Sequence, residues 1–167
     1  NLVGGTIDVD NVTNTVGSVD LDSAASVVAL DISATSGAAT VNVDGDTTVS
    51  LGDVVANAAV TIDANDDVTV GDITSTTSTI VIDLGLAADA SATANTFGNF
   101  SSTGATINGN DGVDFFTLNA GNITSAGAVE FNGATGNDTF NLNFGNFDVV
   151  GGTENPVSGA AASSMVF

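Results

Sequence analysis

The sequence predicts an all-β fold: a parallel β-helix, or β-solenoid, of about six and a half coils of roughly 19–26 residues each. Three observations predict it: a repeat of about 19 to 20 residues, alternation of apolar and polar residues within each repeat, and a composition that leaves no credible long helix. The 167 residues include 20 Gly and 1 Pro, and 43% of them are hydrophobic, which can supply a core along the whole chain.

The repeat is clearest in two consecutive segments, VNVDGDTTVSLGDVVANAA from Val41 and VTIDANDDVTVGDITSTTST from Val60. Each has an alternating strand, an Asp-rich turn, a second alternating strand, and then Gly-Asp, an apolar residue and a connection of small residues. The same frame predicts one solenoid over 1–152, with 153–167 as a C-terminal tail or subunit contact. Its half coil and coils are 6–18, 19–40, 41–59, 60–79, 80–105, 106–128 and 129–152.

Superimposing the coils predicts columns of like residues that stack at the strand spacing of about 4.8 Å. All nine Phe lie at or beyond Phe97, where the coils lengthen, which predicts a wider core filled by aromatic rings. One inward column is Leu21, Val43, Ile62, Ile82, Ile107 and Phe131. Another is Ile32, Val54, Ile73, Phe100, Ile123 and Phe147.

The turns form columns of Asp and Asn, whose side chains can bond the local backbone and each other along the stack. After the first strand come Asp22, Asp44, Asp63, Asp83, Asn108 and Asn132. At the second bend come Asn11, Asp31, Asp53, Asp72, Asn99, Asn122 and Asn146. The residues just before the second bend, where we expect a positive φ, are Gly52, Gly71, Gly98, Gly121 and Gly145.

The charge excludes several function classes. The chain has 20 acidic residues and no Lys, Arg or His, giving a formal net charge of −20. Such a surface repels nucleic acid and anionic lipid, and no apolar run approaches the length of a membrane span. The absence of His, Lys, Arg, Cys and Tyr removes nearly every catalytic constellation, and leaves only a carboxylate pair of the glycosidase kind. We therefore expect a protein that is not an enzyme.

Carboxylates without basic partners favour divalent cations, which makes Ca²⁺ the candidate cofactor. Neighbouring Asp side chains at about 4.8 Å repel each other, and a bridging cation removes that cost. Solvation of the Asp side chains as ordinary turn residues is the alternative. The candidate ligands are Asp44, Asp46, Asp63, Asp66, Asp83, Asn110, Asp111, Asp114 and Asp138.

Four N-x-S/T sequons begin at Asn11, Asn99, Asn122 and Asn137, and could accept glycan in a suitable organism. Chance occurrence in an Asn- and Thr-rich chain is the alternative, because Asn99 and Asn122 already have a turn role. The Thr residues do not form an unbroken Thr-x-Thr column, so an ice-binding face is not expected.

Two segments carry a family resemblance. VTIDANDDVTVGDITSTTSTIVID resembles the repeats of filamentous-haemagglutinin-type surface proteins. GATGNDTFNLNFGNFDVVGG is similar to bacterial β-strand-repeat surface proteins, including S-layer and RTX-type adhesins, and its Gly136-Asn-Asp138, like Asn110-Asp-Gly-Val-Asp114, resembles the calcium-binding turns of nonapeptide repeats. The resemblance implies a bacterial, secreted, right-handed β-helix that serves in adhesion, a surface layer or an extracellular fibre, with no catalytic residues to transfer.

Neither end shows the polar cap that repeat proteins normally carry. We therefore expect a structural subunit of an extracellular filament or surface matrix, which assembles head to tail with copies of itself by coil stacking. The alternative is a stalk or binding segment of a larger secreted adhesin or S-layer protein. The expected location is extracellular or at the cell surface, and a glycan or the cell surface is the second candidate partner.

Overall fold

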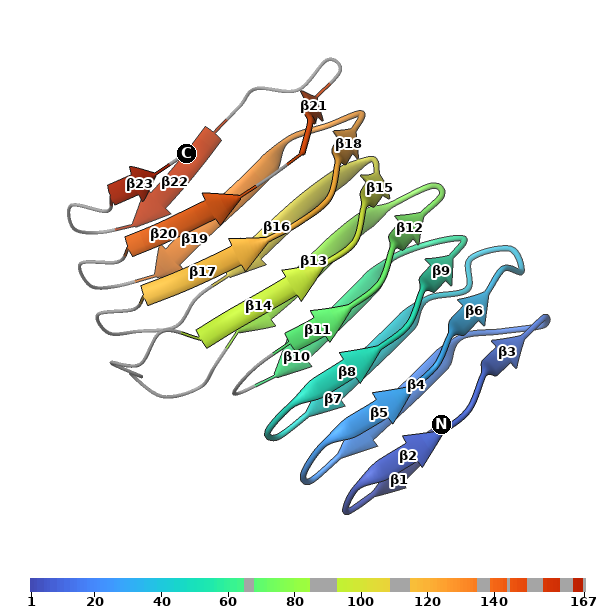
Figure 1. The fold of residues 1–167 in the computed structure, drawn as a ribbon. Helices are drawn as coiled ribbons and strands as arrows, with labels where there is room; N and C mark the ends of the chain where they lie inside the picture. The colour runs from blue at the N-terminus through green and yellow to red at the C-terminus, as the bar shows by residue number, and fades with distance from the viewer. Residues whose placement is uncertain are drawn as a thin grey trace.

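The computed structural model describes residues 1–64, 68–84, 93–108, 115–134, 139–143, 145–149, 155–159 and 164–166. These residues form 23 strands and no helix, arranged in three parallel sheets that wind into a β-solenoid (Figure 1). The predicted all-β parallel fold is confirmed.

The three sheets run the length of the stack, and their described strands lie in the following spatial orders. Sheet A contains β1 (Leu2–Gly4), β4 (Val19–Ser23), β7 (Val41–Gly45), β10 (Val60–Ala64), β13 (Thr79–Leu84), β16 (Gly104–Asn108), β19 (Val129–Ala134) and β22 (Asn155–Gly159). Sheet B contains β2 (Ile7–Val9), β5 (Val27–Ala29), β8 (Val49–Leu51), β11 (Val68–Val70), β14 (Thr93–Phe97), β17 (Phe115–Asn119), β20 (Thr139–Asn143) and β23 (Ser164–Val166). Sheet C contains β3 (Val12–Asn14), β6 (Ile32–Ala34), β9 (Val54–Ala56), β12 (Ile73–Ser75), β15 (Phe100–Ser102), β18 (Ile123–Ser125) and β21 (Phe147–Val149).

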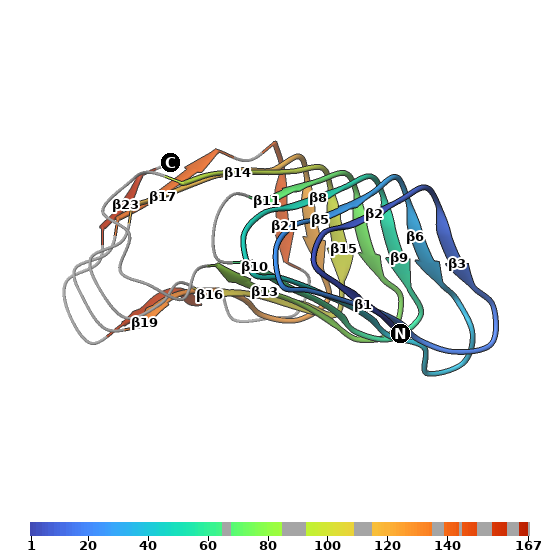
Figure 2. The same cartoon turned by 90° about the horizontal axis from the view of Figure 1, so that it is seen from below.

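Each coil visits sheets A, B and C in turn. Figure 2 shows sheets A and B facing each other, with sheet C closing one side. The sequence pattern predicts only two strands per coil and assigns the stretch after Gly-Asp to one apolar residue and a connection. The structure forms a third strand there, for example β9. In β9 the buried residues Val54 and Ala56 lie on either side of the outward residue Val55. Ala56, the second inward residue of β9, falls in the stretch that the sequence pattern assigned to the connection of small residues.

The predicted inward columns are confirmed by the strand register. In sheet A, Leu21 pairs with Val43, Val43 with Ile62, and the column continues through Ile82 and Ile107 to Phe131. The second column lies in sheet C. Its successive pairs join Ile32, Val54, Ile73, Phe100, Ile123 and Phe147. Alternation of buried and outward residues, as in β10, builds one continuous core between the sheets, whereas Phe147 in β21, at the end of sheet C, is 40% exposed.

The core widens towards the C-terminal half, as the position of the Phe residues predicts. Strands β14, β17 and β20 have five residues each, whereas β5, β8 and β11 have three. The Phe97 and Phe100 rings are buried, with centroids 5.3 Å apart and planes tilted by 55°. Sheet B thus extends further from sheet C in these coils, and the buried Phe97, Phe100 and Phe131 take core positions that Val70, Ile73 and Ile107 hold in the preceding coils.

The sheets include strands outside the predicted coils at both ends of the chain. Strand β1 pairs with β4 through Leu2 and Leu21, ahead of the half coil expected from residue 6. Strands β22 and β23 pair with β19 and β20, inside the 153–167 segment expected as a tail or contact. In these segments the apolar residues are few, so the sequence pattern did not show their pairing.

Candidate functional site

An acidic ladder runs along the outer face of sheet A. The register pairs Asp22 with Asp44, Asp44 with Asp63, and Asp63 with Asp83. Every second residue of these strands faces outward, so the four carboxylates project from one side at the strand spacing of about 4.8 Å. The predicted column is therefore confirmed, and we call Asp22, Asp44, Asp63 and Asp83 the acidic ladder.

The middle of the acidic ladder carries uncompensated charge. Burial raises the pKa of Asp44, and the carboxylates of Asp22, Asp46 and Asp20 raise it further. Burial likewise raises the pKa of Asp63, followed by the carboxylates of Asp44, Asp83 and Asp46. No Lys, Arg or His exists to offset these charges. The ladder is thus a place where a cation, a proton or salt lowers the free energy of the folded chain.

Asn side chains form hydrogen bonds with the acidic residues on the outer face of sheet A. Asn108 follows Asp83 in the register and donates its Nδ2 to Asp83 Oδ1 at 2.5 Å. At the other end of the face, Asn42 donates to Asp20 Oδ1 at 3.0 Å, and Asn1 donates to Asp20 Oδ2 at 2.8 Å. The amides supply hydrogen bonds to the carboxylates without adding charge.

The predicted metal ligands divide into two groups. Asp44, Asp63 and Asp83 lie in the acidic ladder, and the carboxylate of Asp46 is close enough to affect both Asp44 and Asp63. The other predicted ligands lie outside the described residues. They are Asp66, Asn110, Asp111, Asp114 and Asp138.

The acidic ladder offers a line of ligands. Within the described part of the chain, no three acidic groups gather closely enough to hold one ion in a cage. Ca²⁺ takes six to eight oxygen ligands. The described carboxylates therefore suit an ion that bridges two neighbouring Asp residues and keeps most of its water.

A second column, at the bend between sheets B and C, forms a chain of hydrogen bonds. Asp53 Oδ1 accepts the backbone N–H of Asp72 at 2.9 Å, and Asp72 Oδ1 accepts that of Asn99 at 2.7 Å. The same bond recurs at every step. The members of this corner ladder are Asn11, Asp31, Asp53, Asp72, Asn99, Asn122 and Asn146. Each side chain thereby ties its own coil to the next one along the axis.

The glycines beside the corner ladder serve close approach, and the expected positive φ is wrong. Among the described glycines only Gly37 has a positive φ, of 41°. A Cβ on Gly121 would lie 2.7 Å from Asn99 Oδ1, and one on Gly145 would lie 2.7 Å from Asn122 Oδ1. The Gly121 N–H donates to Gly98 O at 2.9 Å. Glycine is required because the backbone packs against the ladder oxygen of the preceding coil.

The corner ladder also accounts for three of the four sequons. Asn11, Asn99 and Asn122 are ladder members, each followed by an inward apolar residue and an outward Thr or Ser. The sequon pattern at this bend therefore follows from the residue types that the fold requires there. Asn137 lies outside the described residues.

Asn95 is a structural residue that the sequence pattern does not identify. Its side chain is fully buried, its Oδ1 accepts the Val68 N–H at 3.0 Å, and its Nδ2 has no hydrogen-bond partner. Strand β11 pairs with β14 from Thr69 and Thr96 onwards, and the Asn95 side chain accepts the N–H of Val68, the residue just before these pairs. Asn95 supplies that acceptor where sheet B lengthens, and the only sequence signal is an Asn at an inward position.

Comparison with known proteins found no matching family model, no matching curated protein and no matching solved structure. The described residues contain no helix that is long and apolar enough to cross a membrane.

Proposed function

We propose that this protein is a non-enzymatic structural subunit of an extracellular filament or surface matrix, which grows head to tail by stacking coils. The observation that carries the proposal is the in-register stacking of three parallel sheets along one axis. Parallel sheet edges present unpaired N–H and C=O groups, which a further strand can pair with. The resemblance to bacterial surface proteins supports the extracellular location.

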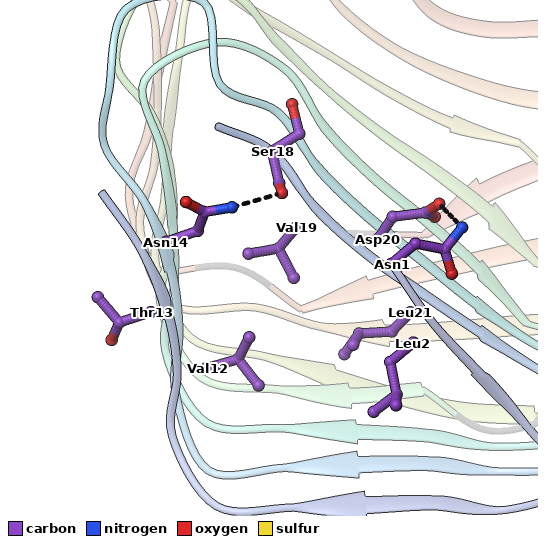
Figure 3. A pocket seen from close by; sticks show the side chains of 9 residues that line it. All are labelled: Asn1, Leu2, Val12, Thr13, Asn14, Ser18, Val19, Asp20 and Leu21. Carbon is purple, nitrogen blue, oxygen red and sulfur yellow. Dashed lines mark hydrogen bonds between the residues drawn. The ribbon is translucent and has the colours of Figure 1, made fainter. Parts of the chain in front are cut away.

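The end of the stack formed by β1, β2 and β3 suits such an addition. Among the described strands, each of these three pairs on one side only. Leu2 and Val3 are 43% and 66% exposed, and a cavity of about 220 Å³ opens between β1, β3 and β4 (Figure 3). Its apolar lining consists of Leu2, Val12, Val19 and Leu21, with polar side chains such as Asn14 and Asp20 around it. A stacked coil would cover this apolar surface and supply the missing ladder bonds.

Calcium is the proposed counterion. Ions that bridge Asp44, Asp63 and Asp83 would neutralise repulsion that the fold itself creates on sheet A. In a filament Asn108 and Asn132 would separate the acidic ladder of one subunit from that of the next, so the cations would act within each subunit.

One observation favours a second candidate, a stalk or binding segment of a larger adhesin or S-layer protein. Among the described strands, sheets A and B contain eight each, and sheet C contains seven. At the β21 end, the described part of sheet C is therefore one strand shorter than sheets A and B. A partner that covers this end evenly needs one additional strand beside β21. Strands β1, β2 and β3 of a second copy contribute one strand to each sheet and supply no additional one.

Electron microscopy of the purified protein, with calcium and with chelator, tests the proposal. Filaments with an axial repeat of about 38 Å, eight strands at about 4.8 Å each, are expected. Loss of the filaments in chelator would show that assembly depends on calcium. Isolated short rods in both conditions, at protein concentrations up to the solubility limit, would instead support the segment of a larger protein.

A further inference from the structure

The outer face of sheet B is free of charge over most of its length, in contrast to sheet A. The five consecutive strands β8, β11, β14, β17 and β20 contain no acidic residue. In sheet A, acidic residues occur on β4, β7, β10, β13 and β19. The two sheets face opposite directions across the core (Figure 2). The net charge of −20 is therefore unevenly distributed around the axis.

One outward residue from each of these five strands lies in a single row of short polar side chains. The register joins them in sequence, and all are exposed except Asn119, which is half-buried. Asn143 donates its Nδ2 to Asn119 Oδ1 at 3.0 Å. The sheet B row is Ser50, Thr69, Thr96, Asn119 and Asn143.

We infer that the sheet B row is a lateral contact surface for a second copy of this chain, paired face to face across a two-fold axis at Thr96. The inference extends the proposed function from axial to lateral assembly and rests on it. The charge distribution identifies the partner. A chain with 20 acidic residues and no basic one repels its own copies on sheet A, so an uncharged face is where two copies can approach. Strands β6, β9, β12, β15 and β18 of sheet C also contain no acidic residue, but they contain no Asn either, and only the sheet B row combines hydroxyls with amides.

The row is chemically self-complementary under this symmetry. A two-fold axis at Thr96 places Thr69 opposite the partner's Asn119 and Ser50 opposite the partner's Asn143, because the row has even strand spacing. The hydroxyls of Ser50 and Thr69 thereby meet amides that can both donate and accept, and the Thr96 hydroxyl meets that of the partner's Thr96. Asp8, the charged outward residue on β2, lies outside the five matched positions.

The contact is small for an isolated pair. Five strands at about 4.8 Å, each about 10–17 Å long, cover about 250–400 Å² per copy, below the roughly 800 Å² of a stable complex. Repetition along a filament would multiply the contact without any new surface. Weak pairing of free chains and side-by-side alignment of filaments are both expected.

Thiol cross-linking tests the pairing directly, because the natural chain has no Cys. Thr96→Cys places one thiol on the two-fold axis, where a short bismaleimide can bridge two faces about 10 Å apart. Ser101→Cys, on the outward face of β15 in the same coil, is the matched control. Circular dichroism checks that both variants retain the strand content of the natural chain. We expect at least five-fold more cross-linked dimer from Thr96→Cys than from Ser101→Cys.

A mixing experiment fixes the symmetry. Thr69→Cys and Asn119→Cys should cross-link with each other several-fold more than either does with itself. Equal yields from Thr96→Cys and Ser101→Cys would overturn the inference, whether or not filaments form. A different set of results would assign the sheet B row to a polysaccharide and not to a second copy. In that case the protein binds insoluble neutral polysaccharide, Thr69→Asp abolishes this binding, and Thr96→Cys gives no cross-linked dimer. Cross-linking without filaments in microscopy would instead reject only the axial assembly.

Discussion

Asp72 and Asn99 are joined by three hydrogen bonds across neighbouring coils. Asp72 Oδ1 accepts the Asn99 backbone N–H at 2.7 Å, and the Asn99 Nδ2 donates to the two carboxylate oxygens at 3.0 and 3.1 Å. The backbone bond, followed by the side-chain bonds, lowers the pKa of Asp72. The pair is the centre of the corner ladder and shows how this fold fixes its axial register with side chains as well as strands.

Replacing Asp72 with Ala should destabilise the chain by about 1 kcal/mol, because Asn99 loses hydrogen bonds to a charged acceptor in a solvent-exposed corner. Urea unfolding followed by circular dichroism measures the change. Asp8→Ala, on the exposed outer face of sheet B, is the matched control and should change stability by less than about 0.5 kcal/mol. Equal effects of both substitutions would show that the corner ladder adds nothing to stability.

Adding a methyl group at the corner should cost more than removing one ladder bond. Gly98→Ala drives a Cβ into Asp72 Oδ1 and the backbone of Gly71, so we expect a loss of about 1–3 kcal/mol. Gly5→Ala is the control, because a Cβ there meets no atom within 4 Å. Thermal unfolding of both variants gives the comparison. A Gly98→Ala chain as stable as Gly5→Ala would mean that the corner expands freely.

The acidic ladder should make the folded chain more stable in mild acid than at neutral pH. Folding raises the pKa of Asp44 and Asp63 above the ordinary 3.8, so the folded state binds more protons than the unfolded chain in that window. This contribution is fully present below pH 3.8 and is lost as the pH rises through the raised values. Asp72 acts in the opposite sense: its contribution is present above pH 3.8 and is lost as the pH falls through its lowered pKa.

Asp63→Asn should therefore raise the stability at pH 7, by several tenths of a kcal/mol to about 1 kcal/mol after allowance for solvent screening. It should also reduce the gain in Tm on acidification from pH 7 to pH 5. A Tm series in buffers of equal ionic strength measures both effects, with Asp8→Asn as the control away from the ladder. A lower Tm of Asp63→Asn at pH 7 would contradict a repulsive ladder.

Calcium should stabilise the chain beyond the effect of ionic strength. A ligand that binds only the folded state raises stability by RT ln(1 + [L]/Kd), so Tm should climb with calcium concentration. The comparison solution contains NaCl at matched ionic strength, and chelator should reverse the shift. The calcium-specific part should be reduced in the double substitution Asp44→Asn with Asp63→Asn. A calcium response that persists in this variant would assign the ion to another part of the chain.

The sequence by itself determined the parallel solenoid, the two inward columns and both Asx columns. These features depend on repetition at one spacing, and stacking a repeat on itself places Ile62 beside Ile82 and Asp63 beside Asp83 without further information. The prediction of wider coils from Phe97 onwards agrees with the five-residue strands of sheet B there.

Only the tertiary structure decided the features that depend on contacts between coils. The third strand of each coil, the pairing of β1 and β22 and the role of buried Asn95 all require a neighbouring coil as partner. The glycines before the bend are the clearest case, since the sequence shows that glycine recurs but not why. A side-chain oxygen of the preceding coil fills the space that a Cβ needs, and that distance exists only once the coils are stacked.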